Sequence, residues 1–161
     1  RNDAVLDRAL ARLPRGSGFV YRHYHLPAAR RLHRWRELAR IARAHGHWLF
    51  WAGDPHAARL HRADGSYGPP RSARRQPGMI RIVTAHSLAE LGVAQRAGAD
   101  AVMLSPAFPT RSHPGARTLG PLRFRLIAAQ AAVPVIALGG MHRITAKRLA
   151  WARWAAIDGL S

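Results

Sequence analysis

The stretch Val133-Pro-Val-Ile-Ala-Leu-Gly-Gly-Met141 decides the fold class of this chain. A short apolar run that ends in paired glycines is typical of a buried parallel strand opening onto a ligand. Gly139 and Gly140 carry no Cβ, so an anion such as phosphate can approach their backbone N–H groups. The N-terminal end of the helix expected over 144–154 would face the same place. The alternative is a tight turn without a ligand, which is the stronger interpretation for an isolated Gly-Gly pair.

Outward from this stretch, strands and helices alternate along the sequence. Hydrophobic periodicity and breaker residues predict helices over 3–13, 27–45, 55–61, 87–98, 121–131 and 144–154. They predict strands over 18–24, 47–51, 65–68, 79–84, 101–105, 133–138 and 156–161. Ser87 is the expected N-cap of its helix, with Glu90 at capping-box spacing. Repeated βα units predict an α/β fold with a parallel sheet covered by helices.

The count of strands points to a barrel. The chain starts with a helix where a βα alternation would start with a strand, so we expect that a first strand upstream of Arg1 is missing. With that strand restored, the pattern predicts a minimal (β/α)8 TIM barrel forming one domain over residues 1–161, and a doubly wound sheet is the alternative. Barrel loops after strands seven and eight often bind phosphate. The predicted phosphate-binding residues there are Gly139, Gly140, Gly159, Leu160 and Ser161.

Composition limits the class of protein. A chain of 161 residues with 48% hydrophobic residues can bury a sizeable core. No apolar run is long enough to span a membrane and no signal-like segment opens the sequence, so we expect a cytoplasmic protein without membrane contacts. The absence of cysteine excludes disulfides, thiolate metal sites and a cysteine nucleophile.

The charge of the chain is strongly basic. It has 26 Lys and Arg residues against 8 Asp and Glu, a net charge of +18. Nucleic acid, anionic lipid and phosphorylated metabolites would all be attracted. The arginines are spread along the chain and no nucleic-acid-binding motif accompanies them, which favours a solvated surface over nucleic-acid binding. The oligomeric state, including a homo-oligomer, stays open.

Four segments carry a resemblance to a known family. They are Thr84-Ala-His-Ser87, Gly98 to Thr110, Leu119-Gly120 and Val133 to Met141. In this order they resemble the motifs of the thiamine-phosphate synthase/TenI family, and together they cover about half of the chain. The resemblance implies a TIM barrel and a part in thiamine biosynthesis. It also implies the synthase reaction, in which a hydroxymethylpyrimidine pyrophosphate is joined to a thiazole phosphate with Mg²⁺ and pyrophosphate is lost.

The half of the site that would hold magnesium and pyrophosphate departs from the family pattern. The family's Gln-x-Arg-x-Lys falls on Val20 to Tyr24, so that only Arg22 matches. Its Asn-Asp falls on Ala52-Gly53, with Asp54 as the one nearby substitute. Its His-x-Gly-Gln-x-Asp falls on residues 67–72, which contain no carboxylate. We therefore predict no recognisable metal ligands, and Mg²⁺ as a cofactor only if the chain is an active synthase.

The other half of the site is better preserved. The family's Thr-x-Thr-Lys reads Thr110-Arg-Ser112-His113, and Thr84 stands where a serine contacts pyrophosphate. The resemblance thus adds Arg22, Thr84, Thr110, Ser112 and His113 to the predicted substrate-binding residues. The histidine expected of a TenI-type thiazole tautomerase corresponds to Pro106, which counts against that activity.

Other conspicuous residues have ordinary explanations. The pairs His23/His25 and His45/His47 lack a carboxylate partner at ligand spacing, which argues against metal binding. Trp151 and Trp154 are expected to pack from the last helix against the barrel. Asp64 and Asp100, each just before a strand, are expected to serve structure. Arg71, Arg74 and Arg75 replace the metal motif, where they bind pyrophosphate or are solvated.

Three functional hypotheses follow, with no catalytic residue assigned. The first is a thiamine-phosphate synthase-like transferase, whose competence the lost carboxylates put in question. The second is a non-catalytic or repurposed barrel that binds a thiazole phosphate or a similar phosphorylated heterocycle. The third, nucleic-acid binding, rests on charge alone.

Overall fold

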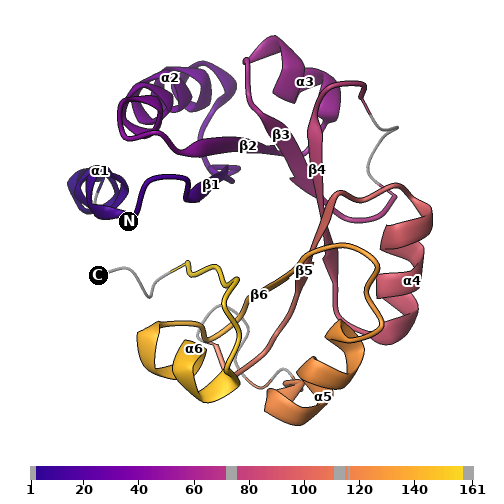
Figure 1. Ribbon diagram of the computed structural model, residues 1–161. Helices are drawn as coiled ribbons and strands as arrows, with labels where there is room; N and C mark the ends of the chain where they lie inside the picture. Colours follow the sequence, from indigo (N-terminus) through magenta and orange to yellow (C-terminus); the bar gives the residue numbers. More distant parts are fainter. Residues whose placement is uncertain (1–2, 72–75, 111–114, 116, 158–161) are drawn as a thin grey trace. The chain divides into compact units, whose positions relative to one another are not determined.

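The computed structural model describes residues 3–71, 76–110, 115 and 117–157 (Figure 1). Contacts divide the chain into two compact units. The first contains residues 1–67 and 76–79, and the second contains residues 68–75 and 80–160. Each unit is described separately below. The expectation of a single domain over 1–161 stays a prediction.

The α/β class is confirmed by the order of elements. The helices are α1 Asp3–Arg12, α2 Ala28–Ala44, α3 Pro55–Leu60, α4 Leu88–Arg96, α5 Gly120–Ala128 and α6 Arg143–Leu149. The strands are β1 Gly18–Tyr21, β2 Trp48–Ala52, β3 Gly65–Gly68, β4 Ile80–Ala85, β5 Ala101–Leu104 and β6 Val135–Ala137. The predicted helices and strands up to β6 all exist, with ends that differ by a few residues.

In the first unit, β2 lies between β1 and β3 and pairs with both in parallel. Tyr21 and Trp51 are register partners and pack with Trp35 of α2 in a core of buried aromatic and aliphatic side chains. The Trp35 and Trp51 rings meet edge to face at 5.3 Å, an arrangement that aromatic pairs prefer. Side chains alternate along a strand, so Phe50 and Ala52 lie on the face away from this core.

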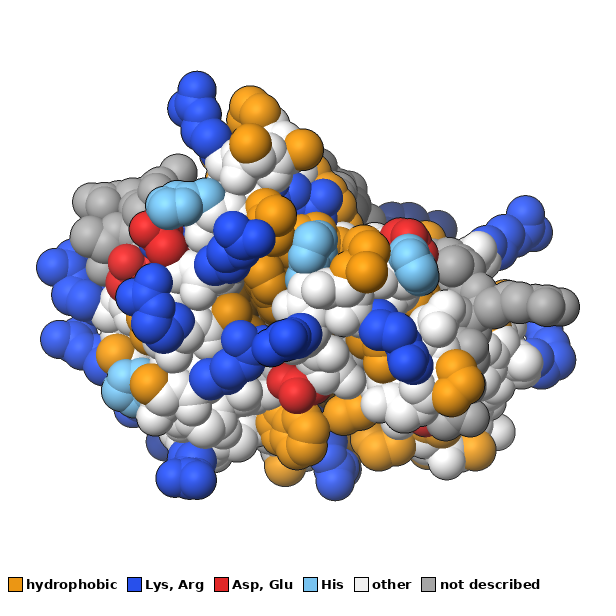
Figure 2. Space-filling model, turned by 90° about the horizontal axis from the view of Figure 1, so that it is seen from above, with side chains coloured by type: hydrophobic (Ala, Val, Ile, Leu, Met, Phe, Trp, Pro, Cys, Tyr) orange, Lys and Arg blue, Asp and Glu red, His pale blue; other side chains and the backbone are white. Residues whose placement is uncertain are grey.

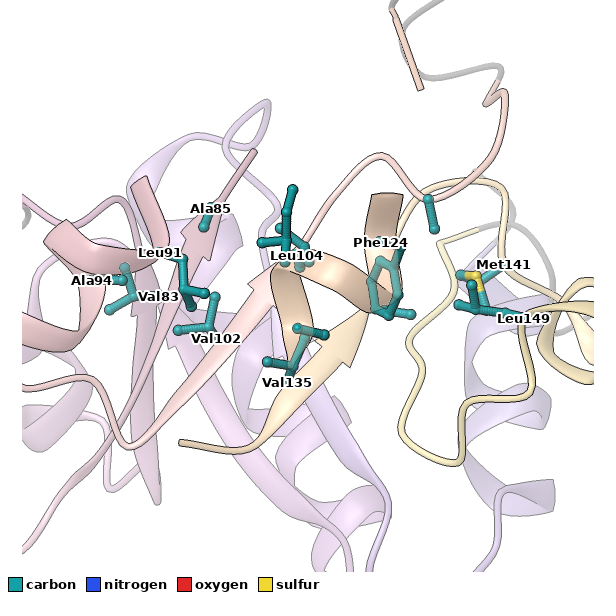
Figure 3. Packing of buried hydrophobic residues seen from close by; sticks show 14 of the residues in the cluster. Val83, Ala85, Leu91, Ala94, Val102, Leu104, Phe124, Val135, Met141 and Leu149 are labelled. Atoms are coloured by element: carbon teal, nitrogen blue, oxygen red, sulfur yellow. The ribbon is translucent and has the colours of Figure 1, made fainter. Parts of the chain in front are cut away.

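The second unit has β5 between β4 and β6, again in parallel. Figure 3 shows Val83, Val102 and Val135, which come from the three strands, lying with Leu91 of α4 and Phe124 of α5. Val83 is paired in register with Val102, and Val102 with Val135, so one face of this sheet is a continuous apolar row. The helices cover that face and bury it.

Each unit uses an aspartate to begin a strand. Asp64, just before β3, accepts the backbone N–H of Leu49 on its carboxylate at 2.7 Å and donates its own N–H to the Leu49 carbonyl at 2.8 Å. Asp100, just before β5, does the same with Arg81, at 2.8 and 2.9 Å. The structural role expected for these two residues is confirmed.

The expectations for the end of the chain need correction. The helix expected over 144–154 ends at Leu149, because Ala150 adopts a left-handed conformation with φ 51°. Trp154 lies beyond it and forms a parallel bridge with Ala137, so extended pairing begins before the predicted strand 156–161. Residues 156 and 157 are not in a strand, and 158–161 lie outside the described residues. Trp151 packs as expected, although from a loop: its ring meets Phe124 at 5.4 Å.

On the face seen in Figure 2, Lys and Arg side chains are spread among hydrophobic and neutral ones and do not gather in one patch. Among the described residues, no helix is long and apolar enough to cross a membrane. The expected preference for a solvated basic surface over nucleic-acid binding stays a prediction.

Candidate functional site

The glycine turn after β6 is held against the loop that follows β5. Gly139 and Gly140 have φ 90° and 62°, a region that favours glycine. A Cβ on Gly139 would lie 2.7 Å from the Cα of Pro106, and one on Gly140 would collide with the Pro109 carbonyl. Phe108 donates its N–H to the Gly139 carbonyl at 3.0 Å. Both glycines are therefore required by close backbone packing, independently of any ligand.

The same turn leaves backbone donors available. Within the described part of the chain, the N–H groups of Gly139, Gly140 and Met141 donate no hydrogen bond. The next N–H, of His142, is bonded to the Thr145 hydroxyl at 2.8 Å, which closes the start of α6. Three successive unpaired N–H groups in a glycine turn are a setting suited to an oxyanion.

Thr84 and Thr110 belong to the same unit as this turn. Thr84 lies near the carboxyl end of β4, and Thr110 follows Pro109 in the loop beside Gly140. The carboxyl ends of parallel strands share one edge of a sheet, so both threonines and the glycine turn belong to that edge of the second unit.

His86, which follows β4, is hydrogen-bonded to the loop after β5. Its Nδ1 lies 2.8 Å from the Ser105 carbonyl and 3.2 Å from the Ser105 hydroxyl. Its backbone N–H donates to the Glu90 carboxylate at 2.9 Å. Ser87 is the N-cap of α4 as predicted, but Glu90 returns to His86, one residue before the cap.

Half of the predicted site residues cannot be placed. Ser112, His113, Gly159, Leu160 and Ser161 lie outside the described residues, as do Arg74 and Arg75 of the loop before β4. Arg71 is described and exposed. Assignments of ligand contacts to all of these residues stay predictions.

Arg22, the remaining predicted site residue, belongs to the first unit. It directly follows β1 and is exposed, and its Cζ lies 5.9 Å from the centre of the Tyr67 ring at the end of β3. Tyr67 is only 7% exposed. Burial raises the pKa of the Tyr67 phenol, the positive charge of Arg22 lowers it, and Tyr24 raises it further. Sequence reasoning did not identify Tyr67 as a site residue, because it stands where the family's His-x-Gly-Gln-x-Asp has a histidine.

Arg31 of α2 was also not identified from the sequence. Its Cζ lies 4.4 Å from the Trp51 ring and 5.0 Å from the Tyr24 ring. It donates to the Ala52 carbonyl at 3.2 Å. Because Trp51 faces the core beneath the helices, Arg31 anchors α2 to the end of β2 on that side of the sheet. An arginine in the first turn of a helix carries no sequence signal for this contact.

In the second unit the glycine turn and the two threonines lie at the carboxyl ends of parallel strands, the edge at which α/β proteins usually bind their ligands. The sequence profile of the family described as "Thiamine monophosphate synthase" matches residues 2–160. The chain belongs to this family, and the resemblance found in its motifs is confirmed.

Individual relatives agree with this membership. A "Putative thiamine-phosphate synthase 2" of Aquifex aeolicus is 37% identical over 82 residues, which are 51% of this chain and 44% of the relative. A "Thiamine-phosphate synthase" of Synechococcus sp. is 31% identical over 156 residues, which cover 91% of this chain and 44% of the relative. The matched part is thus less than half the length of either relative.

A solved structure shows the same fold. The "Thiamine phosphate pyrophosphorylase" of Pyrococcus furiosus superposes with a TM-score of 0.79 at 20% identity, covering 99% of this chain and 84% of that one. This likeness confirms the TIM-barrel-like fold expected from the strand count.

Magnesium, on which the family generally depends, does not fit the described residues. Hard cations such as Mg²⁺ prefer carboxylate oxygens. Asp54, the one candidate substitute, accepts the N–H of His56 at 3.0 Å and caps α3. The described residues contain no group of three His, Asp or Glu side chains arranged to hold a metal. No step of the chemistry is therefore assigned to a metal here.

Proposed function

We propose that this chain is a thiamine-phosphate synthase-like protein of thiamine biosynthesis that binds a thiazole phosphate at the Gly139–Gly140 turn. The unpaired N–H groups of Gly139, Gly140 and Met141 are the observation that carries this proposal. Each can donate to a phosphate oxygen, and hydrogen bonds to a charged partner contribute about 1.5–3 kcal/mol each. Membership of the family supports thiamine biosynthesis and a cytoplasmic location as part of the proposal.

The proposed reaction joins the thiazole phosphate to a hydroxymethylpyrimidine pyrophosphate. A bond forms from the thiazole nitrogen to the pyrimidine methylene carbon, and the bond from that carbon to the pyrophosphate oxygen breaks. The leaving pyrophosphate carries the electron pair away, so cationic or hydrogen-bonding groups must stabilise it.

A second candidate function is binding of a phosphorylated heterocycle without catalysis. The positions of the family's two aspartates hold Gly53 and Ser72, and this loss of carboxylates favours the second candidate. It differs from the first in one respect, which is the absence of turnover.

Calorimetry with thiazole phosphate, and with the thiazole alcohol that lacks phosphate, tests the binding step. We expect the phosphate form to bind and the alcohol to bind at least about tenfold more weakly. Thr110→Val should weaken binding of the phosphate form, whereas Thr118→Val, the same change farther along the loop, should not. Equal affinity for phosphate and alcohol would overturn the proposal.

Formation of thiamine phosphate from both substrates, followed chromatographically, separates the two candidates. Product formed at a rate proportional to protein concentration supports the synthase. Binding without product, under conditions in which a standard synthase turns over, supports the non-catalytic barrel and rejects the synthase.

A further inference from the structure

Two polar side chains meet at the carboxyl ends of β1 and β3, in the half of the site where the family places its metal. The Arg22 guanidinium lies over the Tyr67 ring, with 5.9 Å between Cζ and the ring centre. Among the described residues, no carboxylate forms an ion pair with Arg22. Its positive charge is therefore available to an anion.

Tyr67 supplies a neutral donor beside this charge. Within the described part of the chain its hydroxyl makes no hydrogen bond and is not among the buried polar atoms without a partner, although the residue is only 7% exposed. Burial is the largest influence on the phenol and raises its pKa above the ordinary 10.0. The hydroxyl thus keeps its proton at neutral pH and can donate it in a hydrogen bond.

The neighbouring end of β2 leaves room beside this pair. Ala52 is the register partner of Tyr67, and Gly53 follows it with its N–H bonded to the Tyr67 carbonyl at 2.9 Å. A Cβ placed on Gly53 would meet nothing within 4 Å. The Asp54 carboxylate is engaged by the N–H of His56. In the family these positions carry polar metal-binding side chains, and here they are small.

We propose that Arg22 and the Tyr67 hydroxyl form an anion subsite that takes the diphosphate group of a small molecule directly, without a bridging metal ion. The guanidinium supplies the positive charge that a divalent cation would supply, and the phenol donates one hydrogen bond to a phosphate oxygen. This inference rests on the proposed function, because the diphosphate would belong to its pyrimidine substrate. It differs from the family's chemistry in the group that binds the diphosphate.

Inorganic pyrophosphate is the probe for this subsite, with binding measured by calorimetry in EDTA and again in excess Mg²⁺. We expect binding in EDTA that Mg²⁺ does not strengthen. Tyr67→Phe removes only the hydroxyl and should weaken binding about tenfold, as expected for one hydrogen bond to a charged group. Arg22→Gln should weaken it at least as much.

Two variants of the same unit serve as matched controls. Arg30→Gln and Arg40→Gln each remove an exposed arginine of α2. Both should bind pyrophosphate like the parent chain. Thermal melting of every variant shows whether folding is retained. Arg22→Lys keeps the positive charge, so when folded it should bind pyrophosphate more tightly than Arg22→Gln does.

Three outcomes would overturn the inference: pyrophosphate binding that requires Mg²⁺, no binding in either condition, or losses in Arg22→Gln and Tyr67→Phe no larger than the loss in Arg30→Gln. Thiazole phosphate binding is measured on the same variants and should be unchanged. If thiazole phosphate fails to bind while pyrophosphate binds in EDTA, the proposed function fails and this subsite stands. The reverse result rejects the subsite alone.

Discussion

The carboxylate of Asp100 accepts the backbone N–H of Arg81 at 2.8 Å, while the Asp100 N–H donates to the Arg81 carbonyl at 2.9 Å. This reciprocal pair joins the residue before β5 to β4 and sets the register of the two strands. The Arg81 side chain also donates to the Ala97 and Pro70 carbonyls, so one residue holds three segments of the second unit.

Asp100→Ala should destabilise the protein, because the Arg81 N–H loses its acceptor where Arg81 is buried. We expect a loss of about 1–3 kcal/mol in the free energy of unfolding, measured in urea. Asp100→Asn keeps a carbonyl oxygen and should retain more than half of that energy. A urea midpoint for Asp100→Ala equal to that of the parent would contradict the role given to this pair.

Gly140→Ala should destabilise the second unit through a steric collision with the loop after β5. Its Cβ would meet the Pro109 carbonyl and Phe108. We expect a loss of about 2–4 kcal/mol, from overpacking and left-handed strain together.

Gly120→Ala is the matched control for this prediction. Gly120 has φ 66°, close to the 62° of Gly140, and a Cβ there would meet nothing within 4 Å. Strain alone should make it about 1 kcal/mol less stable. Equal losses in the two variants would show that the close approach at Gly140 contributes nothing.

Arg31→Lys should loosen α2 from the end of β2. Lysine keeps the charge but not the planar group that lies against Trp51 at 4.4 Å. We expect about 1 kcal/mol lower stability in urea unfolding, together with a change in tryptophan fluorescence of the folded state. Arg30→Lys, at an exposed neighbouring position, should change neither quantity.

His61 should make stability depend on pH. Burial, followed by the charges of Arg31 and Arg36, lowers the pKa of His61 below its ordinary value of 6.5. The unfolded chain therefore binds a proton at His61 more readily than the folded chain. The contribution of neutral His61 to the free energy of unfolding is fully present above the unfolded pKa of 6.5, and it is lost as the pH falls through the lower folded pKa.

His61→Phe isolates this contribution, because it keeps a ring beside Trp51, 4.4 Å from it in the parent. The urea midpoint of the parent should fall more steeply than that of the variant between about pH 7 and pH 5. Parallel pH profiles for the two proteins would disprove the assignment to His61.

Local patterns in the sequence were sufficient for the βα alternation and for the glycine turn. The run from Val133 to Leu138 is apolar and is followed by two glycines, so a strand and the turn after it could both be predicted. The helix after it was predicted too long. Trp151 lies at a spacing that continues the helical period of apolar residues, but the left-handed backbone at Ala150 ends the helix before it. Trp151 Nε1 instead donates to the Val135 carbonyl at 2.9 Å, a contact between distant segments.

The candidate site was only partly readable for the same reason. Thr84 lies near the end of its strand, and Thr110, Gly139 and Gly140 follow theirs. All four belong to segments that resemble family motifs, so their shared edge could be expected. Tyr67 departs from the family motif at its position, and its closeness to Arg22 depends on β2 lying between β1 and β3. A contact between side chains 45 positions apart leaves no local pattern in composition or spacing.

The sequence by itself determined the α/β class, the family and the order of helices and strands up to β6, because periodicity, breakers and motifs act over a few neighbouring residues. Only the tertiary structure decided that Gly139 and Gly140 are required by backbone packing against Pro106 and Pro109 and that Asp54 is engaged as a helix cap. These relationships arise when the paired strands bring distant loops together, and the chemistry of a side chain then depends on neighbours that its own segment does not specify.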